Sequence, residues 1–342
     1  MSRMTEDPRI DPRIKETFGE LPAFPLPSFD SREELVAAMN APEVLEGLKS
    51  TTLFTEEEAE AVAPSQGMTI TTETFVSEPD GNTIQVSLMR PESDGPLPCV
   101  YYIHGGGMAV MSAFDMSYQA WGRMIANQGV AVAMVDFRNC VIPSSAPEIE
   151  PYPAGLNDCV SGLRWLISQA DEFGIDSSRI LVAGESGGGN LTLAVGLRLT
   201  REGDAGLVTG LYAMCPYIAG SWPRDDLPSS IENNEVWLDS HSNFGRMGYG
   251  MDAFEAQDPE AWPLFANEEH VQGFPATVIS VNECDPLRDE GIAFYRLLLR
   301  AGQSAHCRQV MGTIHGGDNM VLPCTDLALA TARDVAAFCR GN

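Results

Sequence analysis

The feature that most constrains this chain is a G-x-S-x-G pattern between an apolar strand pattern and a helical one. The pattern occupies residues 184–188. Residues 179–183, before it, have the apolar character of a short buried strand, and residues 190–197, after it, are typical of a helix packed on a sheet. A serine in so sharp a turn projects its hydroxyl away from the backbone, and only small neighbours fit around it. Ser186 is therefore a candidate nucleophile, and the pattern predicts a serine hydrolase.

The same pattern also occurs as a purely structural, Gly-rich turn that opens a helix. The following helix nevertheless has a chemical use, because its N-terminus carries partial positive charge where an oxyanion would form. A hydrolase further needs a general base, an acid that orients the base, and donors for the oxyanion. The rest of the chain has to supply these groups.

Length and charge limit the classes of protein that this chain can be. Its 342 residues, 44% of them hydrophobic, suffice for one large α/β domain with an appended cap or for two modest domains. The net charge of −27 would be repelled by phosphate backbones and anionic membranes, so we expect no nucleic-acid or membrane partner. Lys15 and Lys49 are the only lysines; so acidic a surface fits a saline habitat or, more simply, solubility.

Targeting and cysteine patterns point to the cytoplasm. The first eight residues lack the apolar stretch of a signal peptide, and no apolar run approaches the roughly 18 residues of a membrane span. There is no C-x-x-C pattern and no Cys/His ligand spacing, so we expect reduced, mostly buried thiols and no metal site. The eight cysteines stand at positions 99, 140, 159, 215, 284, 307, 324 and 339.

The order of strand and helix patterns predicts a doubly wound α/β fold. The first 65 residues are Pro-rich and then helical and acidic, and two strand patterns flanking an Asp-Gly turn predict a hairpin. Six further strands alternate with helices, which predicts an eight-stranded, mostly parallel sheet with helices on both faces. We expect strands at 69–77, 83–89, 99–103, 130–136, 180–183, 208–214, 277–281 and 306–311, and helices at 118–127, 156–173, 188–199, 288–301 and 325–339.

Residues 217–272 interrupt this alternation with turns and aromatic residues but no strand pattern. A connection of this length inside a compact domain is usually a lid or a binding segment. With the N-terminal helices it would form a cap over the carboxyl edge of the sheet; the alternative is a peripheral insertion whose aromatic residues are only core. We therefore divide the chain into an N-terminal helical cap segment (1–66), a first core part (67–216), a cap insertion (217–272) and a second core part (273–342).

His315 is the candidate general base. In the α/β-hydrolase order the acid and then the histidine follow the serine. His306 lies inside a predicted strand, whereas His315 lies in the loop after it, from which its ring can reach Ser186 Oγ. The remaining histidines come too early in the chain: His104, His241 and His270.

Asp285 is the candidate acid that orients the histidine. It lies in the turn after the predicted strand 277–281, and Pro286 ends that strand. Asp289 is a rival, but a carboxylate there is more typical of the cap of the following helix. Glu283 is a second rival. Its other interpretations are a further hydrogen-bond acceptor near the site or a solvated side chain.

The candidate oxyanion donors come from two glycine-containing turns. Residues 104–107 read His-Gly-Gly-Gly directly after the predicted strand 99–103. Glycines let backbone N–H groups approach a ligand closely because no Cβ intervenes. The Gly187 N–H, directly after the serine, supplies another donor. A flexible turn is the plainer interpretation of the glycines, and we expect His104 to brace the loop rather than to act as the base.

Together these motifs resemble the hormone-sensitive-lipase family of esterases, in its bacterial family IV branch. The resemblance extends from about residue 70 to the C-terminus. It implies an α/β-hydrolase fold with a helical cap, no metal or cofactor, hydrolysis of small-molecule carboxylic esters, and a homodimer. Carried over by position, it assigns Ser186 as nucleophile, His315 as base, Asp285 as acid, and the N–H groups of Gly105, Gly106 and Gly187 as the oxyanion hole.

The chain also departs from the family pattern. Glu185 and Gly187 stand where the family commonly has Asp and Ala, and His315 is followed by Gly-Gly rather than Gly-Phe. The family stretch Asp-Tyr-Arg-Leu-Ala-Pro-Glu is replaced from residue 136 by Asp-Phe-Arg-Asn-Cys and a longer Pro-rich loop. We therefore expect residues 139–152, with Asn139 or Cys140, to shape the pocket differently from the family's.

The function predicted from these residues is a serine carboxylesterase that hydrolyses short-chain esters through an acyl-enzyme. A lactone, amide or β-lactam hydrolase would use the same groups and differ only in its pocket. A non-catalytic ligand-binding module is the alternative from another class, since plant hormone receptors resemble this family. Such receptors keep the serine turn but lose the triad, whereas this chain retains all three residues. A triglyceride lipase is disfavoured because no long apolar surface helix is evident.

Overall fold

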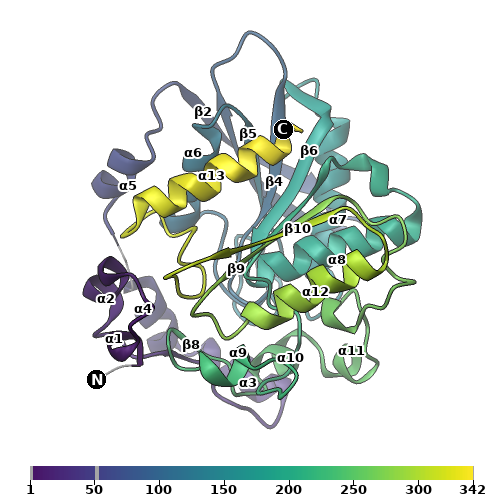
Figure 1. Cartoon of the computed structure of the whole chain (residues 1–342). Helices are drawn as coiled ribbons and strands as arrows, with labels where there is room; N and C mark the ends of the chain where they lie inside the picture. The colour runs from purple at the N-terminus through teal and green to yellow at the C-terminus, as the bar shows by residue number, and fades with distance from the viewer. Residues whose placement is uncertain (1–2, 51–53, 342) are drawn as a thin grey trace.

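The computed structural model of the chain describes residues 3–50 and 54–341. Figure 1 shows a central twisted sheet with helices packed on both of its faces and further helices gathered below one end of its strands. All eight predicted strands are present. They are β2 (Met68–Val76), β3 (Thr83–Pro91), β4 (Leu97–Ile103), β5 (Ala131–Asp136), β6 (Ile175–Glu185), β7 (Gly210–Met214), β9 (Thr277–Asn282) and β10 (Ala305–Val310).

The sheet is mostly parallel, as predicted. Its spatial order is β10-β9-β7-β6-β4-β5-β3-β2. The opening hairpin β2–β3 is antiparallel, and β3 pairs antiparallel with β5, whereas every other neighbouring pair runs parallel. The carboxyl ends of six consecutive strands in this order, β10 to β5, therefore meet at one edge of the sheet.

Two apolar layers cover the sheet, because neighbouring residues of a strand point to opposite faces. Tyr101 and Tyr102 of β4 illustrate this, since both are fully buried but belong to different core clusters. Tyr101 packs on the side of α7 and α8, and Tyr102 on the side of α6 and α13. The main helices are α6 (Met116–Ala126), α7 (Ala154–Ser168), α8 (Gly187–Glu202), α12 (Arg288–Arg300) and α13 (Thr325–Cys339).

Residues 3–50 and 217–272 lie side by side below the carboxyl edge in Figure 1, whereas the helix Glu56–Val62 lies beside α6. One helix ends at Met39, a second begins at Pro42, and Thr55 and Glu58 form a capping box at the start of a third. The elements are α1 (Arg3–Glu6), α2 (Pro12–Phe18), β1 (Phe24–Pro25), α3 (Arg32–Met39), α4 (Pro42–Ser50) and α5 (Glu56–Val62), then α9 (Ser229–Glu232), β8 (Leu238–Asp239), α10 (Phe244–Tyr249) and α11 (Met251–Glu255).

The expectation of no strand within 217–272 is wrong at β8. This two-residue strand pairs in parallel with β1, which also has only two residues. Strands this short contain no periodic pattern, and each is defined only by its distant partner. The pairing is one of several ties between the N-terminal part and 217–272.

Long-range hydrogen bonds make the other ties. Arg9 Nη1 forms an ion pair of 2.7 Å with Glu232. Asn243 accepts from Phe29 N at 2.9 Å and donates to Phe29 O at 2.7 Å. Arg32 Nε donates to the carbonyl of Gly248 at 3.3 Å. Residues 3–40 are therefore bound directly to residues 217–272.

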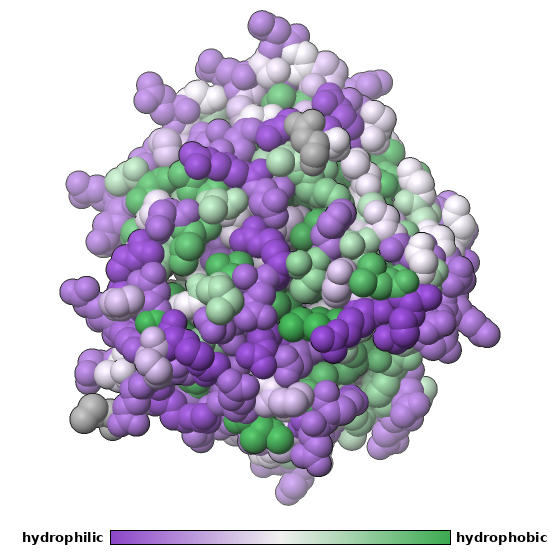
Figure 2. Space-filling view, viewed as in Figure 1, coloured by the Kyte–Doolittle hydropathy of each residue, from purple (hydrophilic) through white to green (hydrophobic). Residues whose placement is uncertain are grey.

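The outer surface is strongly polar. The face drawn in Figure 2 is mostly hydrophilic, with apolar residues in small separate groups. Seven of the eight thiols are buried, and Cys307 is half-buried. None of the helices within residues 3–50 and 54–341 is long and apolar enough to cross a membrane.

Candidate active site

Ser186 lies at the predicted strand–turn–helix junction, between β6 and α8. Its backbone is left-handed, with φ 56° and ψ −117°, a conformation that costs energy for any residue with a Cβ. Its N–H donates to Met214 O at 2.9 Å, and its carbonyl accepts from Asn190 N at 2.9 Å and Tyr217 N at 3.0 Å. The turn is thus fixed to β7, to α8 and to the first residue of the 217–272 segment.

Close packing explains why glycines surround the serine. A Cβ on Gly188 would lie 2.0 Å from Ile103 O, and one on Gly184 would lie 2.6 Å from the same carbonyl. The turn therefore rests directly on the end of β4. A larger residue at either position would push the serine away from this strand.

The three predicted triad side chains form one hydrogen-bonded chain. His315 Nε2 lies 2.9 Å from Ser186 Oγ, and His315 Nδ1 lies 2.9 Å from Asp285 Oδ2. Asp285 follows β9 by three residues and His315 follows β10 by five, so both lie at the carboxyl edge. Asp285 is fully buried, and its Oδ1 accepts from Leu287 N at 2.9 Å. The carboxylate is therefore held in a single orientation toward the ring.

The surroundings of His315 favour its protonated form. Burial lowers the pKa of His315, but the Asp285 carboxylate raises it more, so the pKa stands well above 6.5. An imidazolium at this position would therefore be stabilised by the carboxylate that faces it.

Sequence reasoning missed Cys215 at this site. It directly follows β7, has φ 34° and is fully buried. Its sulfur lies within 4.8 Å of a ligand atom of both Asp285 and His315, and in the described part of the chain this is the only cluster of potential metal ligands. Both ring nitrogens of His315 already face protein partners. Burial raises the pKa of Cys215, so the thiol stays protonated.

The rival histidines lie outside this chain of hydrogen bonds. His104 is buried and stacks on Phe137 with ring centroids 4.4 Å apart, and its Nε2 lies 3.5 Å from Asp136. Burial lowers the pKa of His104, which agrees with a bracing role. His306 is exposed on β10, whereas His241 and His270 form hydrogen bonds within residues 217–272.

The rival acids hold other parts of the structure. Glu283 accepts from Gly312 N at 2.8 Å, at the start of the loop that carries His315. Asp289 lies in the first turn of α12, where a carboxylate is favourable as expected, although it is not the N-cap residue. Its carboxylate accepts from Ser229 N at 2.7 Å and from Arg288, and the N-cap position is Leu287. The carboxylate thus ties α12 to α9, a partner 60 residues away that the local pattern cannot reveal.

The Gly-rich loop after β4 contains Gly105 and Gly106, which with Gly187 make up the three expected oxyanion donors. The Gly105 N–H donates to Glu185 Oε1 and to Tyr118 OH, both at 2.9 Å. This donor thus already has acceptors within the protein. Gly107, which was not among the expected donors, approaches Gly187, because a Cβ on Gly187 would lie 2.7 Å from Gly107 N.

Glu185, the residue before the serine, is buried beneath this loop. Its Oε2 accepts from Tyr102 OH and its Oε1 from Tyr118 OH, each at 2.5 Å. Burial raises the pKa of Glu185 to about 7, although both tyrosine hydrogen bonds oppose that rise. The sequence singles out Glu185 only as a departure from the family pattern and contains no sign of its partners.

The aromatic residues of 217–272 form a buried cluster next to the serine turn. Tyr217 stacks on Trp222 at 4.5 Å and meets Trp262 edge-on at 5.7 Å. Glu290 of α12 holds the start of this segment, accepting from Ile218 N at 2.6 Å and from Trp222 Nε1 at 2.7 Å. The aromatic residues are thus packed core, and Tyr217 connects that core to Ser186.

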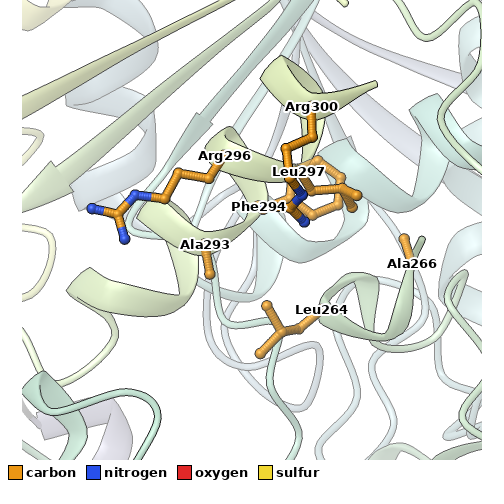
Figure 3. Close-up of a pocket in the computed structure, with 7 residues that line it drawn as sticks. All are labelled: Leu264, Ala266, Ala293, Phe294, Arg296, Leu297 and Arg300. Atoms are coloured by element: carbon orange, nitrogen blue, oxygen red, sulfur yellow. The ribbon is translucent and has the colours of Figure 1, made fainter. Parts of the chain in front are cut away.

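Asn139 and Cys140, expected to shape the pocket, are both buried. Asn139 Nδ2 donates to Met111 O at 2.8 Å, which links this stretch to the segment after the Gly-rich loop. A cavity of about 290 Å³ lies elsewhere, between α12 and residues 264–266 (Figure 3). None of the candidate site residues lines it, so it is not part of this site.

Comparison with known proteins agrees with the fold and the motifs. Residues 100–318 match a family model described as alpha/beta hydrolase fold, and the chain belongs to this family. Within it, the protein is one of the esterases related to hormone-sensitive lipase, which makes it a carboxylic ester hydrolase.

Individual relatives show how far the likeness extends. The chain is 34% identical over 248 residues to carboxylesterase NlhH of Mycobacterium tuberculosis, covering 71% of this chain and 74% of that protein. The structure of esterase Est22 is 56% identical with a TM-score of 0.95, covering 99% of this chain and 100% of that one. Brefeldin A esterase, described as a bacterial homologue of human hormone-sensitive lipase, is 33% identical with a TM-score of 0.85, over 98% and 94% of the two chains.

Proposed function

We propose that this protein hydrolyses short-chain carboxylic esters through an acyl-enzyme on Ser186. One observation carries the proposal, namely the continuous hydrogen-bonded chain from Ser186 Oγ through His315 to Asp285, with both distances 2.9 Å. In the neutral ring Nδ1–H donates to Asp285, which leaves Nε2 free to accept the serine proton. This is the tautomer that a general base requires.

Acylation begins when Ser186 Oγ attacks the ester carbonyl carbon and His315 Nε2 takes its proton. The Asp285 carboxylate stabilises the imidazolium that forms, in line with the raised pKa of His315. The carbonyl π electrons move to the oxygen and produce a tetrahedral oxyanion. When this intermediate collapses, the bond to the alkoxide breaks and His315 returns the proton to the leaving alcohol.

We propose that the N–H groups of Gly106, Gly107 and Gly187 stabilise that oxyanion. Two observations support this set: the Gly105 N–H is already engaged by Glu185, and the Gly107 backbone lies against Gly187. Gly106 and Gly107 have φ of 90° and 64°, which glycine adopts without strain. The N-terminus of α8 adds partial positive charge. Removal of one such donor typically costs about 10²–10³ in kcat.

Deacylation uses the same groups with water in place of the serine. His315 takes a proton from a water molecule, which attacks the acyl carbon, and the new tetrahedral intermediate releases the carboxylic acid. His315 then returns its proton to Ser186 Oγ. The products are one alcohol and one acid, and no metal or cofactor takes part in this scheme.

The proposed substrates are small esters with short acyl chains. One relative, 28% identical over 239 residues, is the ethyl acetate hydrolase of Pseudomonas putida, and ethyl acetate is a short ester. We further propose that segments 1–66 and 217–272 act as the cap that encloses the acyl group. The homodimer and the cytoplasmic location stay predictions from the sequence.

Hydrolysis of p-nitrophenyl esters from acetate to decanoate tests the proposal. We expect wild type to prefer the shortest chains, and Ser186→Ala to lose on the order of 10⁶ in kcat because no nucleophile remains. Ser177→Ala, an exposed serine of the same strand β6, is the matched control and should keep wild-type rates. Retained activity in Ser186→Ala would refute the acyl-enzyme. A folded but inactive wild type would favour a narrower hydrolase or a ligand-binding module.

A further inference from the structure

Glu185 joins the two turns that bracket the reacting carbonyl group. It is the last residue of β6, directly before Ser186, while Gly105 belongs to the loop after the neighbouring strand β4. The Gly105 N–H donates to Glu185 Oε1 at 2.9 Å. Among the described residues, this bond links the serine turn to the backbone that leads into Gly106 and Gly107.

Two tyrosines hold the carboxylate in place. Tyr102, on β4, donates to Oε2, and Tyr118, on α6, donates to Oε1, both at 2.5 Å. Tyr118 OH in turn accepts from Gly105 N at 2.9 Å. Three donors from β4, α6 and the Gly-rich loop thus converge on one buried carboxyl group.

The loop rests on this carboxylate with no spare room. A Cβ on Gly105 would lie 2.3 Å from Glu185 Oε1 and 3.0 Å from Tyr118 OH. Gly105 is therefore fixed in position as well as hydrogen-bonded. Because the next two residues carry the proposed oxyanion donors, a shift of Gly105 would move those donors as well.

We propose that Glu185 is a positioning residue for the oxyanion hole: its carboxylate, oriented by Tyr102 and Tyr118, holds Gly105 and so aims the N–H groups of Gly106 and Gly107. This inference rests on the proposed function, since it presumes an oxyanion formed at Ser186. Glu185 acts through the loop backbone and does not touch the substrate.

The length of the side chain matters in this arrangement. Aspartate, which the family commonly has before the serine, is one methylene shorter. From position 185 it would not reach Gly105 N and both tyrosine hydroxyls at these distances. The glutamate and the two tyrosines therefore form a set, and we expect Glu185→Asp to behave like a partial deletion rather than a conservative change.

The test compares substrate turnover with binding of an oxyanion mimic. An alkyl trifluoromethyl ketone serves as the probe, because Ser186 Oγ adds to its carbonyl carbon, the π electrons move to oxygen, and His315 holds the serine proton. The adduct thus carries the oxyanion without a leaving group. We expect Glu185→Ala to lower kcat for p-nitrophenyl acetate by about 10²-fold, as misplaced groups do, with KM within about threefold of wild type. The inhibition constant for the ketone should rise by the same factor as kcat falls.

Graded variants keep the test informative if the alanine variant does not fold. Glu185→Gln retains one acceptor oxygen for Gly105, and Tyr118→Phe removes one of the two hydroxyls; each should cost about tenfold in both measurements. Tyr101→Phe is the matched control. It removes a fully buried hydroxyl from the same strand β4, but one that donates to Cys159 O on the opposite face. It should leave kcat and ketone affinity unchanged.

Two results would overturn the inference. One is a folded Glu185→Ala or Glu185→Gln enzyme with wild-type kcat. The other is a fall in kcat without a parallel loss of ketone affinity, which would indicate general distortion of the fold. Ser186→Ala separates this failure from that of the proposed function. If it is inactive while the Glu185 variants behave as wild type, only the positioning role fails.

Discussion

The carboxyl edge of the sheet and the segment 217–272 beneath it are held together in different ways. At the edge, Ser186, Asp285 and His315 each follow a strand by at most five residues, and the strand ends set their positions. The segment is instead tied by side chains to parts of the chain far away in sequence. The ion pair of Arg9 with Glu232 joins positions 223 residues apart.

Two buried glutamates show what this difference means. Glu185 accepts from Gly105 N in the loop that carries the proposed oxyanion donors, whereas Glu290 accepts from Ile218 N and Trp222 Nε1 at the start of 217–272. Changes at the edge should therefore act on rate with little effect on folding. Changes beneath it should act on stability with little effect on rate, and the following predictions test this division.

The largest effect is expected for Asp285→Asn at the edge. The imidazole loses its orienting acceptor, so kcat should fall about 10⁴-fold. The acid limb of kcat/KM should also move to lower pH. His315 must be neutral to accept the serine proton, and the Asp285 carboxylate raises the pKa of His315. Without this charge the ring stays neutral to lower pH.

Steady-state rates on p-nitrophenyl acetate between pH 5 and 9 measure both effects. Glu283→Gln, which alters a nearby carboxylate bonded to Gly312 N, serves as the control and should keep the wild-type midpoint. A midpoint that stays fixed or rises in Asp285→Asn would contradict the proposed electrostatic coupling.

A smaller effect, on stability, is expected for Glu290→Gln beneath the edge. Burial raises the pKa of Glu290 from 4.5 to about 8. Between these two pKa values the Glu290 carboxyl group keeps its proton in the folded protein and loses it in the unfolded chain. The free energy of unfolding of the wild type therefore falls as pH rises through this window. The variant should be less stable than wild type at pH 5. Because glutamine does not titrate, the variant lacks the fall in stability of the wild type, and the difference in Tm between the two proteins should narrow by a few degrees by pH 8.

Thermal unfolding followed by circular dichroism at several pH values checks this expectation. Glu255→Gln changes an exposed glutamate of residues 217–272, the segment whose start Glu290 holds, and should follow wild type throughout. A constant difference between Glu290→Gln and wild type across the pH range would show that the carboxyl group does not titrate in this window.

The smallest effect is expected for Asn243→Ala. The variant loses two hydrogen bonds to the backbone of Phe29, which together contribute about 1–2 kcal/mol to the free energy of unfolding. Urea denaturation should show this loss, while kcat for p-nitrophenyl acetate stays within about twofold of wild type. A large drop in kcat at unchanged stability would contradict the expectation that changes beneath the edge act on stability and not on rate.

The same division governs what could be predicted from the sequence. All eight strands of the main sheet were predicted, the buried parallel strands as continuous apolar runs and the hairpin β2–β3 from the Asp-Gly turn between its strands. The approach of Ser186, Asp285 and His315 could be predicted because each lies just beyond a strand whose end was visible. Local pattern and chain order were sufficient there.

The remaining features depend on partners that local pattern does not reveal. Nothing in the sequence shows that Glu185 would accept the N–H of Gly105, an expected oxyanion donor. Cys215 was overlooked, although it directly follows a predicted strand at the same edge. The short strand β8 exists only through its pairing with β1. Each of these features is created by contact between distant segments.

The ties between the N-terminal part and 217–272 also constrain the order in which the protein can be completed. A ribosome makes residues 3–40 well before their partners at Glu232 and Asn243, which are more than 200 residues later. At roughly 5–20 residues per second, these residues wait on the order of 10–40 s for their docking site. Until then Met4, Ile14 and Phe18, all buried in the finished protein, lack their final contacts. During this interval these apolar side chains are open to chaperones and proteases.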